Sequence, residues 1–101
     1  MIENIYQDIK HLVEEEVVDE IFSSEIVKIS RISSTNQTTD WFDEKWKEVA
    51  ILLEGEAIIE FLDRKVEMIK GDIIKIKPHE VHRVINTSPK GLWLAIYFKD
   101  K

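Results

Sequence analysis

The sequence predicts an all-β protein, a sandwich or barrel built from short strands. From residue 26 onward, apolar and polar residues alternate over segments of four to eight residues, as they do in half-buried strands. Turn residues separate these segments, and the three glycines, Gly55, Gly71 and Gly91, all fall at expected turns. The 101 residues are enough for a single core. We therefore expect one domain over residues 1–101.

The expected strands are 26–33, 48–54, 57–62, 66–69, 73–76, 81–86 and 92–98. Gly55 and Glu56 lie between the second and third of them, which predicts a hairpin over 48–62. A polar loop is expected from Ser33 to Asp40. Residues 1–25 have an interrupted apolar pattern, and we expect them to pack on the 26–98 barrel as a short helix or an edge strand.

Composition excludes several classes of function. The absence of cysteine excludes disulfides, thiolate metal sites and a cysteine nucleophile. A formal net charge of −6 argues against binding to nucleic acid, which requires clustered Lys and Arg. No apolar stretch is long enough for a membrane span, and the N-terminus does not resemble a secretory signal. We therefore expect a cytoplasmic protein with neither nucleic-acid nor membrane partners.

Two groups of residues carry a family resemblance. They are Glu48 and Gly55 in the first group, and Gly71, His82 and Asn86 in the second. Their order and spacing resemble the two motifs of the cupin family, and the run GDIIKIKPHEVHRV is similar to a segment of many small bacterial cupins. The resemblance implies an antiparallel cupin-type β-barrel, the double-stranded β-helix or jelly roll. It also implies that Glu48 and His82 lie on neighbouring strands and point into a pocket.

The first motif is incomplete in this chain. Where the family has a His-x-His pair, this sequence has Trp41 and Asp43, or Phe42 and Glu44 if the gap before Glu48 is one residue shorter. A site with three histidines is therefore excluded at these positions. The remaining ligand types predict a divalent-ion site, with Zn, Mn, Fe or Ni as candidate ions. Its expected ligands are Glu48, His82, Asp43 and His79.

Each expected metal ligand also has a structural alternative. His82 could be a hydrogen-bonded interior histidine, and Glu48 a solvated strand end. Asp43 and His79 could be ordinary loop residues.

Four further residues are candidates for contact with an organic ligand. Arg31 shares a strand face with Val27 and Ile29, so it points inward if they do, and it could then bind a carboxylate or phosphate. A salt bridge to Glu48 is the alternative. The aromatic candidates for the pocket wall are Trp41, Phe42 and Tyr97, together with Trp93, although aromatic residues in strands often serve only as core.

Three functions remain open from these observations. The first is a metal-binding cupin that binds or transforms a small organic molecule in the barrel, with catalysis undecided. The second is a metal-free module that binds or senses a small ligand. The third is a structural homodimer, because Val49, Ile51 and Leu53 are expected on the outer face of their strand. A homodimer is expected in each case.

Overall fold

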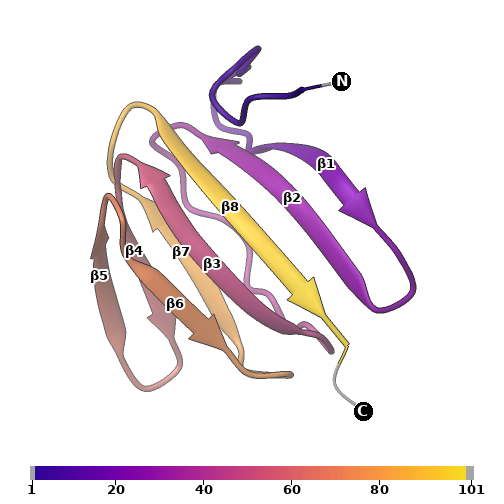
Figure 1. The fold of residues 1–101 in the computed structure, drawn as a ribbon. Coiled ribbons are helices and arrows are strands. Elements are labelled where there is room, and N and C mark those ends of the chain that lie inside the picture. The colour runs from indigo at the N-terminus through magenta and orange to yellow at the C-terminus, as the bar shows by residue number, and fades with distance from the viewer. Residues whose placement is uncertain (1, 100–101) are drawn as a thin grey trace.

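The computed structural model describes residues 2–99, which form two antiparallel sheets that face each other (Figure 1). The strands are β1 (Val17–Ser23), β2 (Val27–Ser34), β3 (Lys47–Glu54), β4 (Glu56–Phe61), β5 (Lys65–Ile69), β6 (Ile73–Ile76), β7 (His82–Asn86) and β8 (Gly91–Phe98). The larger sheet has the order β1-β2-β8-β3-β6, and the smaller sheet has the order β5-β4-β7. The all-β prediction is confirmed, and seven of the eight strands match the expected ranges to within one residue at either end.

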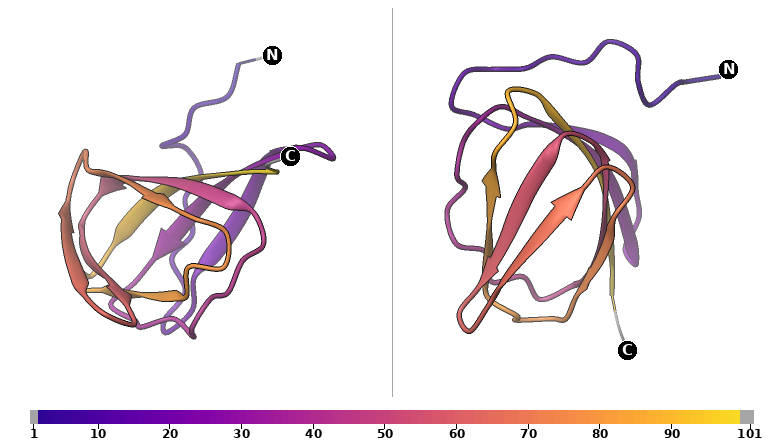
Figure 2. Two further views of the ribbon diagram at one scale, coloured as in Figure 1. Left: turned by 90° about the horizontal axis from the view of Figure 1, so that it is seen from below. Right: turned by 90° about the vertical axis from the view of Figure 1, so that its left-hand side faces the viewer.

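The N-terminal segment adopts the second of its two expected forms. Within residues 2–99 there is no α-helix, and β1 is an edge strand that pairs with β2. Figure 2 shows the residues before β1 running outside the barrel, over one of its ends. No helix in this part of the chain is long and apolar enough to cross a membrane.

The expected hairpin over 48–62 is not formed. Although β3 and β4 are separated by Gly55 alone, β3 pairs with β8 and β6 in the larger sheet, and β4 pairs with β5 and β7 in the smaller one. Gly55 has a φ of +92°, which lets the chain turn from one sheet to the other. A hairpin and a corner between sheets have the same strand-turn-strand pattern in sequence. Only the long-range pairing separates them.

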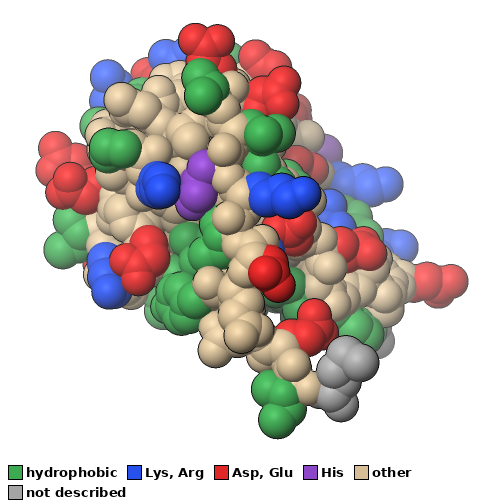
Figure 3. Space-filling view, turned by 90° about the horizontal axis from the view of Figure 1, so that it is seen from above, with side chains coloured by type: hydrophobic (Ala, Val, Ile, Leu, Met, Phe, Trp, Pro, Cys, Tyr) green, Lys and Arg blue, Asp and Glu red, His purple; other side chains and the backbone are tan. Residues whose placement is uncertain are grey.

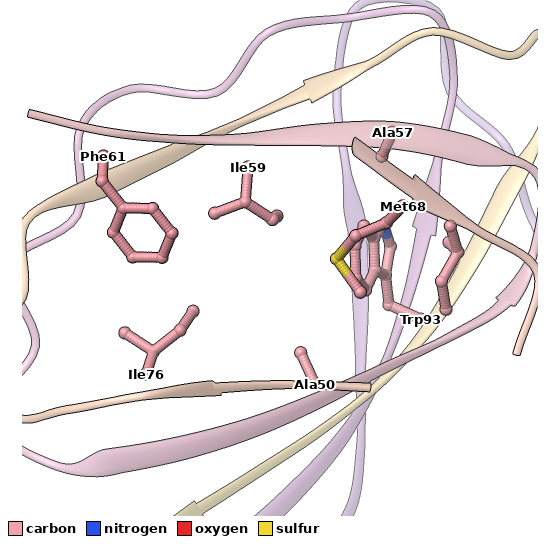
Figure 4. Packing of buried hydrophobic residues seen from close by; sticks show 8 residues of the cluster. Ala50, Ala57, Ile59, Phe61, Met68, Ile76 and Trp93 are labelled. Carbon is pink, nitrogen blue, oxygen red and sulfur yellow. The ribbon is translucent and has the colours of Figure 1, made fainter. Parts of the chain in front are cut away.

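The core lies between the two sheets (Figure 4). Alternate residues of β3 and β4 supply much of it, because successive side chains of a strand point to opposite faces. The cluster consists of Ala50, Leu52, Ala57, Ile59, Phe61, Met68, Ile76 and Trp93. Four of these residues also border the cavity described below.

Arg31 lies on the outer face of β2, and the expectation that it points inward is wrong. Its guanidinium group binds the carboxylate of Asp19 at 2.9 Å. It also donates hydrogen bonds to the backbone carbonyls of Ile5, Gln7 and Asp8. The neighbouring residue Ile32 faces the interior instead. A charged group needs such partners when it is half-buried, and the N-terminal segment provides them outside the barrel. Arg31 therefore fastens that segment to the sheet.

Candidate functional site

A cavity of about 50 Å³ lies between the two sheets. Its walls are mainly aliphatic and aromatic, and the aromatic members are Phe42, Trp93 and Tyr97. Three carboxyl side chains and one imidazole also line it, namely those of Glu16, Glu44, Glu48 and His82. A largely apolar pocket with a few convergent polar groups is typical of small-molecule sites.

Glu48 and His82 face each other across this cavity. The expectation that they lie on neighbouring strands is wrong, since β3 belongs to the larger sheet and β7 to the smaller one. Both residues are buried, with 8% and 3% of their surface exposed. Glu48 Oε1 lies 3.7 Å from His82 Nε2, which is too long for a direct hydrogen bond. The two side chains therefore lie near each other without a direct hydrogen bond.

The backbone next to β7 sets the orientation of the imidazole ring. His82 Nδ1 donates a hydrogen bond to the carbonyl oxygen of Glu80 at 2.9 Å. The rings of Phe42 and Phe61 flank the imidazole, with centroids 5.6 and 6.1 Å away. Because Nδ1 carries the proton that Glu80 accepts, Nε2 is the nitrogen that faces Glu48 and the cavity.

Glu48 is the carboxyl group most strongly affected by its surroundings. Burial raises its pKa from 4.5 to about 7, and the negative charges of Glu44 and Glu16 add to this effect. Tyr97, its direct partner on β8, opposes the shift by hydrogen bonding to the carboxylate. The pKa of Tyr97 is itself raised by burial and by the charge of Glu48. The cavity therefore contains a carboxyl group that titrates near neutral pH.

The segment before β3 supplies one wall of the cavity. Phe42 and His82 exchange two backbone hydrogen bonds, of 2.7 and 3.1 Å, so this segment runs beside β7. Phe42 points into the cavity, whereas Trp41 is exposed and stacks on the guanidinium group of Arg83 at 4.7 Å. Of the four expected ligand contacts, Phe42 and Tyr97 line the cavity, while Trp41 and Arg31 lie outside it.

Asp43 and His79 pair with each other on the surface. Asp43 Oδ1 lies 2.8 Å from His79 Nδ1, and their side chains are 60% and 68% exposed. Neither residue lines the cavity, because the extended backbone turns Asp43 to the side opposite Phe42. The four expected metal ligands therefore do not converge.

Within residues 2–99, no group of three or more His, Asp or Glu side chains is arranged to hold a metal ion. Glu48 and His82 alone fall short of the three or four protein ligands typical of a tight divalent-ion site. The residues present thus do not fit the metal centre that the sequence predicts.

Two lining residues, Glu16 and Glu44, were not among the expected site residues. Glu44 had a signal, because it falls at a motif position when the gap before Glu48 is counted one residue shorter. Glu16 had none, since it is the last of three consecutive glutamates in the N-terminal segment. It reaches the cavity next to Asn86, which also accepts a hydrogen bond from the indole of Trp93.

Comparison with known proteins supports the same architecture. A protein from Ralstonia eutropha, proposed to be a mannose-6-phosphate isomerase, has 25% sequence identity and a TM-score of 0.90 over 99% of both chains. A cupin superfamily protein from Desulfitobacterium hafniense has 22% identity and a TM-score of 0.82, covering 91% of this chain and 84% of that one. A Streptococcus pyogenes protein of unknown function has 13% identity and a TM-score of 0.86, covering 100% and 89%.

No protein with a curated description matches this chain. The family model of the cupin domain, however, matches residues 35–97, which include the segment containing Phe42 and β3 to β7. Together with the two facing sheets and the inward pair of Glu48 and His82, this match shows that the chain belongs to the cupin family.

Proposed function

We propose that this cupin binds a small organic molecule in the cavity between its sheets, and that binding does not depend on a metal ion. The observation that carries the proposal is that the buried side chains of Glu48 and His82 face each other across the cavity, 3.7 Å apart, without a hydrogen bond between them. Glu48 has a hydrogen-bond partner in Tyr97 and His82 has one in the carbonyl of Glu80, but Glu48 Oε1 and His82 Nε2 do not bond to each other. A polar group of a ligand in the cavity, within hydrogen-bond distance of both Oε1 and Nε2, would bridge the two side chains.

The arrangement of ligand-type residues supports the metal-independent form of this proposal. Asp43 and His79 bind each other outside the cavity, which leaves Glu48 and His82 as the only members of the expected metal set inside it. The aliphatic and aromatic walls suit an organic molecule. A carboxyl group with a pKa of about 7 would also offer a general acid or base to a bound molecule.

The name of the Ralstonia protein suggests a sugar phosphate as a second candidate ligand, and the cavity does not favour it. A phosphate group is recognised by Arg, Lys or clustered backbone N–H groups. The described residues that line the cavity include three glutamates and neither Lys nor Arg. Like-charge repulsion would weaken the binding of a phosphate here.

Ligand-observed NMR with a library of small fragments tests the proposal. Fragments that bind the wild-type protein should lose binding in His82→Ala and Glu48→Ala, while both variants keep the dispersed spectrum of a folded barrel. His79→Ala is the matched control, since this exposed histidine lies outside the cavity and its removal should leave binding unchanged.

Three outcomes would contradict the proposal. The first is that no fragment binds the wild-type protein. The second is that both cavity variants unfold with no change in bound species, and the third is that His79→Ala loses binding as His82→Ala does. Elemental analysis of untagged protein, purified without chelator, checks the metal-independent part. One equivalent of a divalent ion per chain would overturn that part.

A further inference from the structure

The charge that faces the cavity is of one sign. Glu16, Glu44 and Glu48 line it, and its described lining contains neither Lys nor Arg. Among the ion pairs within residues 2–99, none joins Glu16 or Glu44 to a basic side chain. Lys28 and Lys45 border a neighbouring pocket together with Glu44 and Tyr97, but neither lysine lines this cavity. Lys28 Nζ lies 4.7 Å from the centroid of the Tyr97 ring. The cavity is therefore acidic inside and is not neutralised by its own walls.

The hydrogen-bonding groups that face the cavity are mainly acceptors. Only 3% of His82 is exposed, and its Nδ1 proton is donated to the carbonyl of Glu80, so Nε2 is an acceptor when the ring carries one proton. Nε2 makes no hydrogen bond to any residue that the structure describes. Ionised carboxylates are acceptors only. A complementary ligand must therefore bring N–H or O–H donors.

The apolar walls decide which kind of donor fits. Phe42, Trp93 and Tyr97 contribute aromatic rings, whose faces attract cations at short range. Most of the remaining lining consists of aliphatic side chains, which can pack against methylene groups but cannot coordinate a metal ion. An organic ammonium group has both the positive charge and the apolar stem that these walls suit.

We infer that the cavity selects a small organic cation, an alkylammonium ion or the ammonium end of a larger amine, with its N–H groups bound by Glu48, His82 and Glu16 or Glu44. This inference rests on the proposed function and narrows it to one class of ligand. The volume of about 50 Å³ gives room for roughly four water-sized groups. Propylammonium, with four non-hydrogen atoms, is therefore a suitable probe.

The test compares three probes of nearly equal size and shape that differ in charge: propylammonium, 1-propanol and propionate. Each is titrated into uniformly labelled protein at pH 8, above the pKa of about 7 of Glu48, and at constant ionic strength. The reporter is the indole N–H of Trp93, because this side chain lines the cavity. Propylammonium should shift the Trp93 signal until the shift saturates. 1-Propanol should bind at least about tenfold more weakly, and propionate should not bind.

Two charge variants and one control refine the test. Glu48→Gln and Glu44→Gln keep the shape of the side chain and remove its charge, and each should weaken propylammonium binding by about tenfold. Glu67→Gln is the matched control, because Glu67 is exposed on β5 and does not line the cavity. It should bind the probe as the wild type does.

The outcomes separate this inference from the proposed function. If 1-propanol or propionate shifts Trp93 as strongly as propylammonium does, the cavity binds small molecules but the selection for cations is wrong. Saturating shifts with Mg²⁺ or Zn²⁺ that block propylammonium would replace the organic cation with a metal ion. If no probe or library fragment shifts Trp93, both the inference and the proposed function fail.

Discussion

Glu48 couples the ligand cavity to the stability of the fold. In the unfolded chain the pKa of its carboxyl group has the ordinary value of 4.5, and in the folded chain burial raises this pKa to about 7. Between these values the unfolded chain releases the proton and the folded chain keeps it. Folding therefore takes up a proton in this window, and the stability present below pH 4.5 is lost as the pH rises through about 7.

This coupling predicts a pH-dependent effect of Glu48→Gln. The two pKa values differ by about 2.5 units, which corresponds to roughly 3 kcal/mol. The variant should match the wild type near pH 4 and be more stable by up to about 3 kcal/mol near pH 8, because the amide never ionises. Urea denaturation at both pH values measures the difference.

A variant that keeps the pH slope of the wild type would show that another group carries it. Glu16 is the first alternative, since burial raises its pKa in the same direction. The pH dependence of the unfolding free energy of Glu16→Gln would then measure the contribution of Glu16.

At the scale of elements, two glycines lie at corners where the chain passes from one sheet to the other. Gly55 joins β3 to β4 and Gly71 lies between β5 and β6, and each connection passes from one sheet to the other. Both glycines have a φ of +92°. They differ in their surroundings, because a Cβ atom at Gly55 would lie 2.5 Å from Ser88 Oγ and 2.9 Å from the carbonyl oxygen of Lys90. A Cβ atom at Gly71 would meet nothing within 4 Å.

The two glycines therefore form a matched pair for substitution. Gly71→Ala should cost about 1–2 kcal/mol of unfolding free energy through backbone strain alone. Gly55→Ala should cost about 1–3 kcal/mol more, because its methyl group also overpacks the corner. Denaturant midpoints of the two variants give the comparison. Equal losses would mean that the chain near Ser88 moves aside without cost.

At the scale of the whole molecule, the outer face of the larger sheet carries a row of apolar side chains. Phe22, Ile29, Ile96 and Val49 are successive cross-strand partners on β1, β2, β8 and β3, so they share this face. Phe22 is 54% exposed, and Ile26 in the following turn is 64% exposed. Figure 3, which views another side of the molecule from above, shows apolar side chains mixed with charged ones.

We propose that this outer face joins two copies of the chain, as the sequence led us to expect from Val49, Ile51 and Leu53. Those three residues are half-buried in the single chain, so the exposed contribution comes instead from the β1 end of the sheet. Because β1 is the edge strand of the larger sheet, a second copy could also cover its unpaired backbone groups.

Sedimentation equilibrium should therefore give the mass of a dimer at micromolar concentration. Phe22→Ser should shift the protein towards monomer, because it removes an exposed aromatic side chain from the row. Leu62→Ser is the control, since Leu62 is 77% exposed just after β4, in the other sheet. A wild-type monomer, or equal effects of the two substitutions, would refute the proposal.

The sequence by itself determined the local structure of this protein. Alternation of apolar and polar residues is a property of a few consecutive positions, so it located the strands after residue 26 nearly to their ends. Turns at Gly55, Gly71 and Gly91 were also predictable from the sequence, and the family resemblance implied that Glu48 and His82 point inward. Phe42 and Tyr97 line the cavity, and their contact with a ligand stays a prediction.

Only the tertiary structure decided which groups meet. A period of two defines two faces of a strand but not which one is inside, and both faces of β2 carry isoleucine, so Arg31 was placed on the wrong side. Asp43 and His79 were expected to bind an ion inside the barrel, but they pair with each other on its surface. Glu16 reaches the cavity through a contact with Asn86, 70 positions along the chain, and no local pattern encodes such a contact.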